Sequence, residues 1–76
     1  MAFNHQLLKE SREENKFTHT ELMFELAKHG LRVSRSTLIN WELGRTEPKI
    51  SDVHALAKLF KMKLEKFLTK EHSPRE

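Results

Sequence analysis

The chain contains no cysteine, no tyrosine, a single tryptophan, and only two glycines and two prolines among its 76 residues. Without cysteine it can form neither a disulfide framework nor a Cys-ligated zinc site, and it has no thiol nucleophile. No apolar run approaches the roughly 20 residues that span a bilayer. The first residues lack the basic and apolar segments of a signal peptide. We therefore expect a soluble, cytosolic domain without a membrane partner.

Charged residues are abundant, but the two signs nearly balance. The chain carries 14 Lys and Arg against 11 Asp and Glu, a formal net charge of +3. Five basic residues stand against five acidic ones in 1–33, three against two in 34–49, and six against four in 50–76. This small C-terminal excess permits a polyanionic partner without establishing one.

The scarcity of glycine and proline, with many Leu, Lys and Glu residues, predicts an all-α fold. Thr18 and Glu21 have the spacing of a capping box, which opens a helix that stops at Gly30. The other expected helices cover residues 4–15, 35–43 after a cap at Ser34, from a cap at Ser51 or Asp52 to Phe60, and 64–69. We expect one domain over residues 1–70 and a flexible C-terminal tail over 71–76.

The helix expected over residues 35–43 has two distinct faces. At about 100° per residue, Leu38 and Trp41 point to the core. The opposite face carries five side chains: Arg35, Ser36, Ile39, Asn40 and Leu43. Arginine matches the acceptors of guanine and asparagine matches adenine in the major groove of DNA. An ordinary solvated face is the alternative that this pattern alone leaves open.

The sequence contains no strong indication of a metal site or a catalytic site. The five histidines have no spacing typical of metal ligands, and no serine has the His and Asp partners of a nucleophile. We therefore expect no catalytic residue, no metal, no cofactor and no small-molecule ligand. The remaining large apolar residues are interpreted as core, although Phe24 and the Phe67–Leu68 end can also supply a dimer contact; they are Phe3, Phe24, Met62, Phe67 and Leu68.

The order of these segments resembles the phage-repressor and Cro-like (XRE-type) helix-turn-helix family over residues 7–68. Residues 33–45 read Val-Ser-Arg-Ser-Thr-Leu-Ile-Asn-Trp-Glu-Leu-Gly-Arg, against the family pattern Val-Ser-x-x-Thr-Ile-x-x-Trp-Glu-x-Gly. The apolar positions from Pro48 to Leu68 keep the family's register without a gap. The resemblance implies a compact five-helix, lambda-repressor-like DNA-binding domain. Its second and third helices would form the helix-turn-helix, with residues 34–43 as the recognition helix in the major groove.

The resemblance also assigns roles to individual residues. The positions that match base-contacting residues are Arg35, Ser36 and Asn40. The positions that match phosphate-contacting residues are Thr18, His19, Arg45, Thr46 and Lys49; for His19, a plain solvated side chain is the alternative. Arg12 and Glu42 match a partly buried structural ion pair between the first and third helices.

Three features depart from the family pattern. Residues 27–32 lengthen the connection between the two central helices, so we expect a longer supporting helix or a looser turn. Met23 stands where the family favours alanine. Ile39 and Leu43 place apolar groups in the middle of the outer face. They can contact thymine methyl groups or form a patch for a protein partner.

These observations favour a sequence-specific transcriptional regulator, a small Cro-like phage or mobile-element switch protein that binds a double-stranded DNA operator. We expect it in the cytoplasm of a bacterial or phage-infected cell, with a homodimer as the usual binding form. The alternative is an antirepressor or modulator that binds a partner repressor protein through Ile39 and Leu43. A third hypothesis is the DNA-binding antitoxin of a toxin–antitoxin pair.

Overall fold

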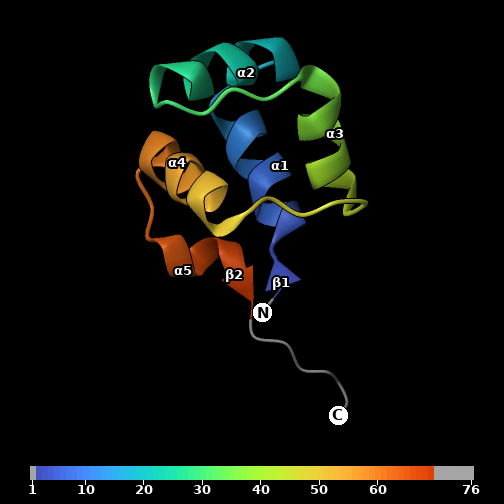
Figure 1. Ribbon diagram of the computed structural model, residues 1–76, viewed down its shortest axis with the longest axis vertical. Coiled ribbons are helices and arrows are strands. Elements are labelled where there is room, and N and C mark those ends of the chain that lie inside the picture. The colour runs from blue at the N-terminus through green and yellow to red at the C-terminus, as the bar shows by residue number, and fades with distance from the viewer. Residues whose placement is uncertain (1, 70–76) are drawn as a thin grey trace.

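Five helices and one short strand pair make up residues 2–69, the part of the chain that the computed structural model describes (Figure 1). The elements are β1 (Ala2–Phe3), α1 (His5–Glu14), α2 (His19–Lys28), α3 (Arg35–Leu43), α4 (Ile50–Phe60), α5 (Leu64–Phe67) and β2 (Leu68–Thr69). The predicted all-α helix-turn-helix fold is thus confirmed. The tail expected at 71–76 lies outside the described residues. None of the helices within residues 2–69 is both long and apolar enough to span a membrane.

Side-chain caps start the first three helices, and the caps of α2 and α3 lie where the sequence predicts them. The Asn4 side chain accepts a hydrogen bond from the Leu7 N–H at 3.0 Å and opens α1. Thr18 and Glu21 form the complete capping box of α2, with both hydrogen bonds present. Ser34 Oγ accepts from the Thr37 N–H at 3.2 Å and opens α3. Each cap satisfies a backbone donor that the first helical turn leaves without a partner.

The fourth helix begins earlier than predicted. Ser51 or Asp52 was expected as the cap, but α4 starts at Ile50, and Lys49 is its N-cap residue. Asp52 is the third helical residue, and its carboxylate accepts from the Lys49 N–H at 3.3 Å. The Asp52 carboxylate therefore accepts a hydrogen bond from the backbone N–H of the N-cap residue, as the third helical residue of a capping box does.

The fifth helix is shorter than the predicted 64–69. It ends at Phe67, and Leu68–Thr69 pairs antiparallel with Ala2–Phe3. The Asn4 N–H donates to the Phe67 carbonyl at 2.6 Å, and the Phe3 and Phe67 rings stack with centroids 5.8 Å apart. Pairing with the N-terminal segment thus overrides a local helical pattern only one turn long.

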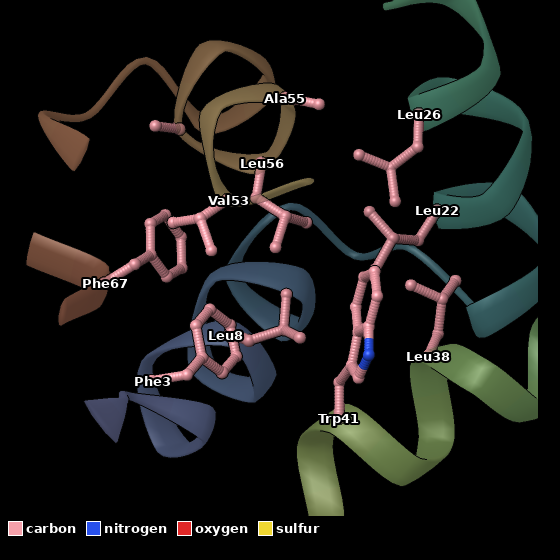
Figure 2. Packing of buried hydrophobic residues seen from close by; sticks show 11 residues of the cluster. Phe3, Leu8, Leu22, Leu26, Leu38, Trp41, Val53, Ala55, Leu56 and Phe67 are labelled. Carbon is pink, nitrogen blue, oxygen red and sulfur yellow. The ribbon is translucent and has the colours of Figure 1, made fainter. Parts of the chain in front are cut away.

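The core lies where α1, α2, α3 and α4 meet (Figure 2). Leu38 and Trp41 enter it from α3, and Leu22 and Leu26 face them from α2. Leu8 of α1 lies between Trp41 and the Phe3 ring in this view. The inner face of α3 is therefore fixed by packing, as the helical pattern predicts, and its outer face remains available.

Phe24 and Phe67 were both interpreted as core, with a dimer contact as the alternative. Phe67 is fully buried, as the core interpretation predicts. Phe24 differs from it, because 60% of its surface is exposed on α2. Phe24 lies on the face of α2 opposite Leu22 and Leu26, where a 3.6-residue helical repeat places it outside the core.

The sequence predicts a lengthened connection between α2 and α3, and the structure shows how this connection is built. Helix α2 continues through Lys28, and residues 29–34 then lead to α3. Gly30 adopts a positive φ of 86° just after the helix, and the Leu31 N–H donates to the Leu26 carbonyl at 3.0 Å. Met23 is half-buried and packs against the core, so this larger residue is accommodated.

Candidate nucleic-acid interface

The three predicted base-contacting residues share the outer side of α3. Arg35 and Ser36 are exposed in its first turn, and Asn40 is half-buried one turn later. No ion pair within residues 2–69 includes the Arg35 guanidinium. The helix therefore presents an arginine whose donors are not committed to a neighbouring carboxylate.

Most of the predicted phosphate-contacting residues lie at the two ends of the helix-turn-helix unit. Arg45, Thr46 and Lys49 are exposed in the segment that joins α3 to α4. Thr18 is exposed at the start of α2, where its hydroxyl oxygen accepts from the Glu21 N–H at 3.1 Å. That hydroxyl can still donate its own hydrogen to an anion.

Glu42 is the point at which three helices meet through polar side chains. Arg12 Nε donates to Glu42 Oε2 at 2.6 Å, and Arg12 Nη2 donates to Oε1 at 3.3 Å. The structure thus brings together the predicted pair of α1 and α3. Only 12% of the Arg12 side chain and 6% of the Glu42 side chain are exposed. Arg12 Nη1 also donates to the Phe17 carbonyl at 2.9 Å, which ties the pair to the segment before α2.

His19 occupies a place that neither sequence interpretation foresaw. Its Nε2 lies 3.1 Å from Glu42 Oε1, so it joins Arg12 on the same carboxylate. Because an ionised carboxylate only accepts hydrogen bonds, Nε2 carries the hydrogen of this contact. His19 is half-buried at the first position of α2. We call Arg12, His19 and Glu42 the Glu42 cluster.

His5 is a second contact to α3 that sequence reasoning missed. Its Nδ1 lies 3.2 Å from the Glu42 carbonyl oxygen, one of the last acceptors of the helix. Its ring also lies against Gly44, where an added Cβ would come within 3.3 Å of the ring. No local pattern predicts this contact, because the two residues are distant in sequence.

A surface hollow of about 360 Å³ lies between α1, the start of α2 and α3. We call it the α1–α3 hollow; its polar lining consists of His5, Gln6, Lys9, Arg12, His19 and Glu42. Ile39 and Leu43 form its apolar side. Ile39 is half-buried, whereas Leu43 is 56% exposed. The apolar groups of the outer face thus share one recess with Lys9 and with the Arg12–Glu42 pair.

A second, smaller hollow of about 220 Å³ lies where residues 32 and 33 pass α2. It is lined by Met23, Phe24, Ala27, Arg32 and Val33. None of these residues belongs to the predicted contact set for DNA. Apart from the side chain of Arg32, this hollow contributes apolar surface.

Comparison with protein families matches residues 6–73 to a family described as the helix-turn-helix domain. No curated protein and no solved structure matches the chain. The match includes α2, α3 and the connection between them, together with both partners of the Arg12–Glu42 pair. The match covers most of the chain, so the chain belongs to the helix-turn-helix domain family, and this domain indicates a DNA-binding regulator.

Proposed function

We propose that this chain is a sequence-specific transcriptional regulator that binds operator DNA with α3 in the major groove. One observation carries the proposal: α3 is held on its inner side and free on its outer side. Leu38 and Trp41 pack it into the core, and Arg12 holds Glu42 at 2.6 Å. A helix fixed in this way can present side chains to base edges without losing much conformational freedom on binding.

Three side chains supply the proposed base contacts. Arg35 suits the O6 and N7 acceptors of guanine, and Asn40 suits the N6 and N7 groups of adenine. Ser36 can donate or accept next to them. These side chains follow one another along the outer face of α3, as the bases do along the groove.

A second set supplies the proposed phosphate contacts. Arg45 and Lys49 bring two positive charges to the segment after α3, and Thr46 adds a hydroxyl. Thr18 and His19 stand at the start of the ten-residue α2, where backbone N–H groups also favour an anion. Contacts of this kind orient the domain on DNA, and the base contacts select the sequence.

The most specific form of the proposal is a Cro-like switch protein of a phage or mobile element, acting in the cytoplasm of a bacterial or phage-infected cell. It would occupy its operator and so exclude polymerase or a competing repressor. Two copies on half-sites about one helical turn apart would supply enough phosphate contacts for tight binding. This form rests on the resemblance of residues 33–45 to such proteins.

A second candidate function is binding to a partner repressor protein through the α3 face. Exposed apolar residues favour it, since Leu43 and Ile50 are each 56% exposed at the two ends of the segment between α3 and α4. Ile39 lies one turn before Leu43. Exposed apolar groups that gather in one region often mark a protein interface.

Selection from a random duplex pool at low and physiological salt separates the two functions. For a DNA-binding regulator we expect an enriched palindromic sequence and an affinity that falls steeply with salt. The absence of an enriched sequence, with weak and salt-sensitive binding only, would contradict the regulator and favour the protein-binding function.

Two matched variants then assign the contacts on the selected duplex. Arg35→Lys keeps the charge but loses the planar fork of donors, so discrimination at one base pair should fall by about 1–3 kcal/mol with an unchanged salt slope. Lys49→Ala should weaken binding to all sequences alike and reduce the salt slope by about 1. If Arg35→Lys leaves the sequence preference intact, Arg35 is not a base-contacting residue.

A further inference from the structure

We propose that two copies of this chain associate through the outer face of α2, where the Phe24 ring of each copy enters the smaller hollow of the other. We call that hollow, beside residues 32 and 33, the Phe24 hollow. The choice of a second copy as the partner rests on the proposed function, which places two copies on DNA but assigns no surface at which they meet. The contact itself needs no DNA and is tested without it.

The first step concerns the exposure of Phe24. Its ring lies on the side of α2 away from Leu22 and Leu26, and 60% of its surface is exposed. The core is closed without it, since Leu22 and Leu26 are fully buried. An aromatic ring that is removed from water on association contributes a large apolar area to the contact.

The second step concerns the space beside the ring. The Phe24 hollow has a volume of about 220 Å³, and Phe24 itself forms part of its lining. Ala27 is exposed in this lining one turn further along α2, so a short side chain leaves room there. Met23 and Arg32 complete the rim, and phenylalanine, methionine and arginine are all enriched at protein interfaces. A protruding ring next to a recess on the same face is self-complementary, as a contact with two-fold symmetry requires.

The third step concerns the distribution of charge along α2. Glu21 is exposed in the first turn, whereas Lys28 lies in the last turn with 69% of its side chain exposed. An antiparallel arrangement of the two α2 helices about Phe24 therefore brings Glu21 of each copy toward Lys28 of the other. A parallel arrangement would place like charges opposite each other and lose affinity.

The net charge of this face also favours a second copy. Glu21 and Glu25 stand against Lys28 and Arg32, so the face is neutral although the whole chain carries a formal charge of +3. Lys28 and Glu25 lie 3.1 Å apart on the same helix, which balances part of this charge within each copy. Two copies that meet here do not bring an excess of positive charge together.

A contact of one ring and one hollow from each copy is small, and small interfaces are weak. We expect a dissociation constant of about 0.1–1 mM in the absence of DNA. The chain is then monomeric at the low micromolar concentrations of thermal melts, and the dimer forms only in concentrated solution.

The test follows the DNA-free chain from about 20 μM to about 1 mM, a range that includes the expected dissociation constant. Sedimentation velocity should show a sedimentation coefficient that rises from that of a monomer toward that of a dimer. Amide NMR spectra over the same range should show concentration-dependent signals from residues 21–28 and 32–33. A chain that stays monomeric throughout overturns the inference, as do signal changes confined to other parts of the molecule.

Three variants identify the surface that associates. Phe24→Ala removes the ring from both copies and should weaken association by at least about tenfold. Ala27→Glu keeps a good helix former but places a longer, charged side chain in the Phe24 hollow, so association should be lost. Ile50→Ala is the matched control, because Ile50 is 56% exposed and lies outside this surface; it should associate like the unmodified chain. Circular dichroism at low concentration confirms that each variant is folded.

The outcomes separate this inference from the proposed function. Association that survives both Phe24→Ala and Ala27→Glu, or that is lost in Ile50→Ala instead, overturns the assignment to α2. A chain that selects a DNA sequence but never associates without DNA overturns this inference and leaves the DNA-binding function intact. Association through Phe24 without any selected DNA sequence supports the contact and contradicts the proposed function alone.

Discussion

At the scale of single residues, Ser11 has a buried hydroxyl group whose hydrogen-bonding capacity is not satisfied. It is buried in α1, and its Oγ has no hydrogen-bond partner within residues 2–69. Its backbone carbonyl is engaged, since the Asn15 side chain donates to it at 2.8 Å. A buried hydroxyl without a partner costs about 1–3 kcal/mol of desolvation. The serine side chain therefore lowers stability at this position.

Replacement of Ser11 by alanine should raise the free energy of unfolding by about 1 kcal/mol, because it removes the unpaired hydroxyl and improves helix propensity. For a domain of this size the melting temperature should rise by about 4–8 °C. Ser34→Ala is the matched control; it removes the cap of α3 and should cost about 1 kcal/mol. If Ser11→Ala also destabilises the protein in thermal melts, the Ser11 hydroxyl contributes a favourable interaction.

At the scale of elements, the end of α3 depends on one glycine. Gly44 has a φ of 77° at the C-cap of α3, a left-handed conformation that costs other residues about 1–2 kcal/mol. The His5 ring packs directly on it, and His5 also contacts the Glu42 carbonyl. Gly30 has a similar φ of 86° but nothing within 4 Å of an added Cβ. A side chain at Gly30 would therefore meet backbone strain alone, whereas a side chain at Gly44 would meet both backbone strain and a steric clash with His5.

Gly30→Ala should lower the free energy of unfolding by about 1 kcal/mol through backbone strain alone. Gly44→Ala should cost more, about 2 kcal/mol, because the His5 ring must also move. Urea denaturation of both variants measures the difference. In a His5→Ala background the additional cost of Gly44→Ala should disappear; if it persists, His5 does not cause it.

The elements also show how far local sequence patterns reach. The starts of α2 and α3 were predictable because Thr18 and Ser34 act on N–H groups within three residues. Asn4 caps α1 in the same way, although the sequence analysis placed it inside that helix. The start of α4 was misplaced because Ser51 or Asp52 was interpreted as its cap, whereas both lie inside the helix and the Asp52 carboxylate accepts from the N–H of Lys49 before it. All of these helix starts depend on hydrogen bonds between residues close in sequence. For α4 the interaction was local as well, but the residue that acts as the cap was wrongly assigned.

Contacts between distant segments were harder to predict. The Arg12–Glu42 pair was expected only through the resemblance to a family. The His19–Glu42 contact joins residues 23 positions apart, and no sequence pattern around either residue predicts it. The β1–β2 pair likewise depends on two segments near opposite ends of the described chain. Such contacts are set by how the helices pack, which a periodic pattern does not specify.

At the scale of the whole molecule, the β1–β2 strand pair closes one end of the described part of the chain (Figure 1). The rings of Phe3 and Phe67 stack beside this pair. Phe3 is buried against Phe67, and the Phe67 ring in turn lies 6.4 Å from that of Phe60. A domain of this length has a total stability of only about 4–11 kcal/mol. One buried aromatic contact can therefore account for a large part of the total free energy of unfolding.

Phe3→Ala should lower the free energy of unfolding by about 3–5 kcal/mol, the usual cost of removing a buried phenylalanine. Phe24→Ala is the matched control, because Phe24 is 60% exposed; its effect should stay within about 0.5 kcal/mol. Circular dichroism melts of the two variants provide the comparison. Equal effects would show that the N-terminal segment does not contribute to the core.

The same strand pair bears on the order in which the chain folds. Helix α3 packs against α1 and α2 within residues 5–43, whereas the hydrogen bond from the Asn4 N–H to the Phe67 carbonyl closes nearly the entire described chain into one loop. Closing so long a loop has a large entropic cost that must be met before its contacts form. The helix-turn-helix unit can therefore assemble first, and the two ends join it last. The amide hydrogen of Asn4 accordingly belongs to the part that opens and exchanges with solvent before the helical core does.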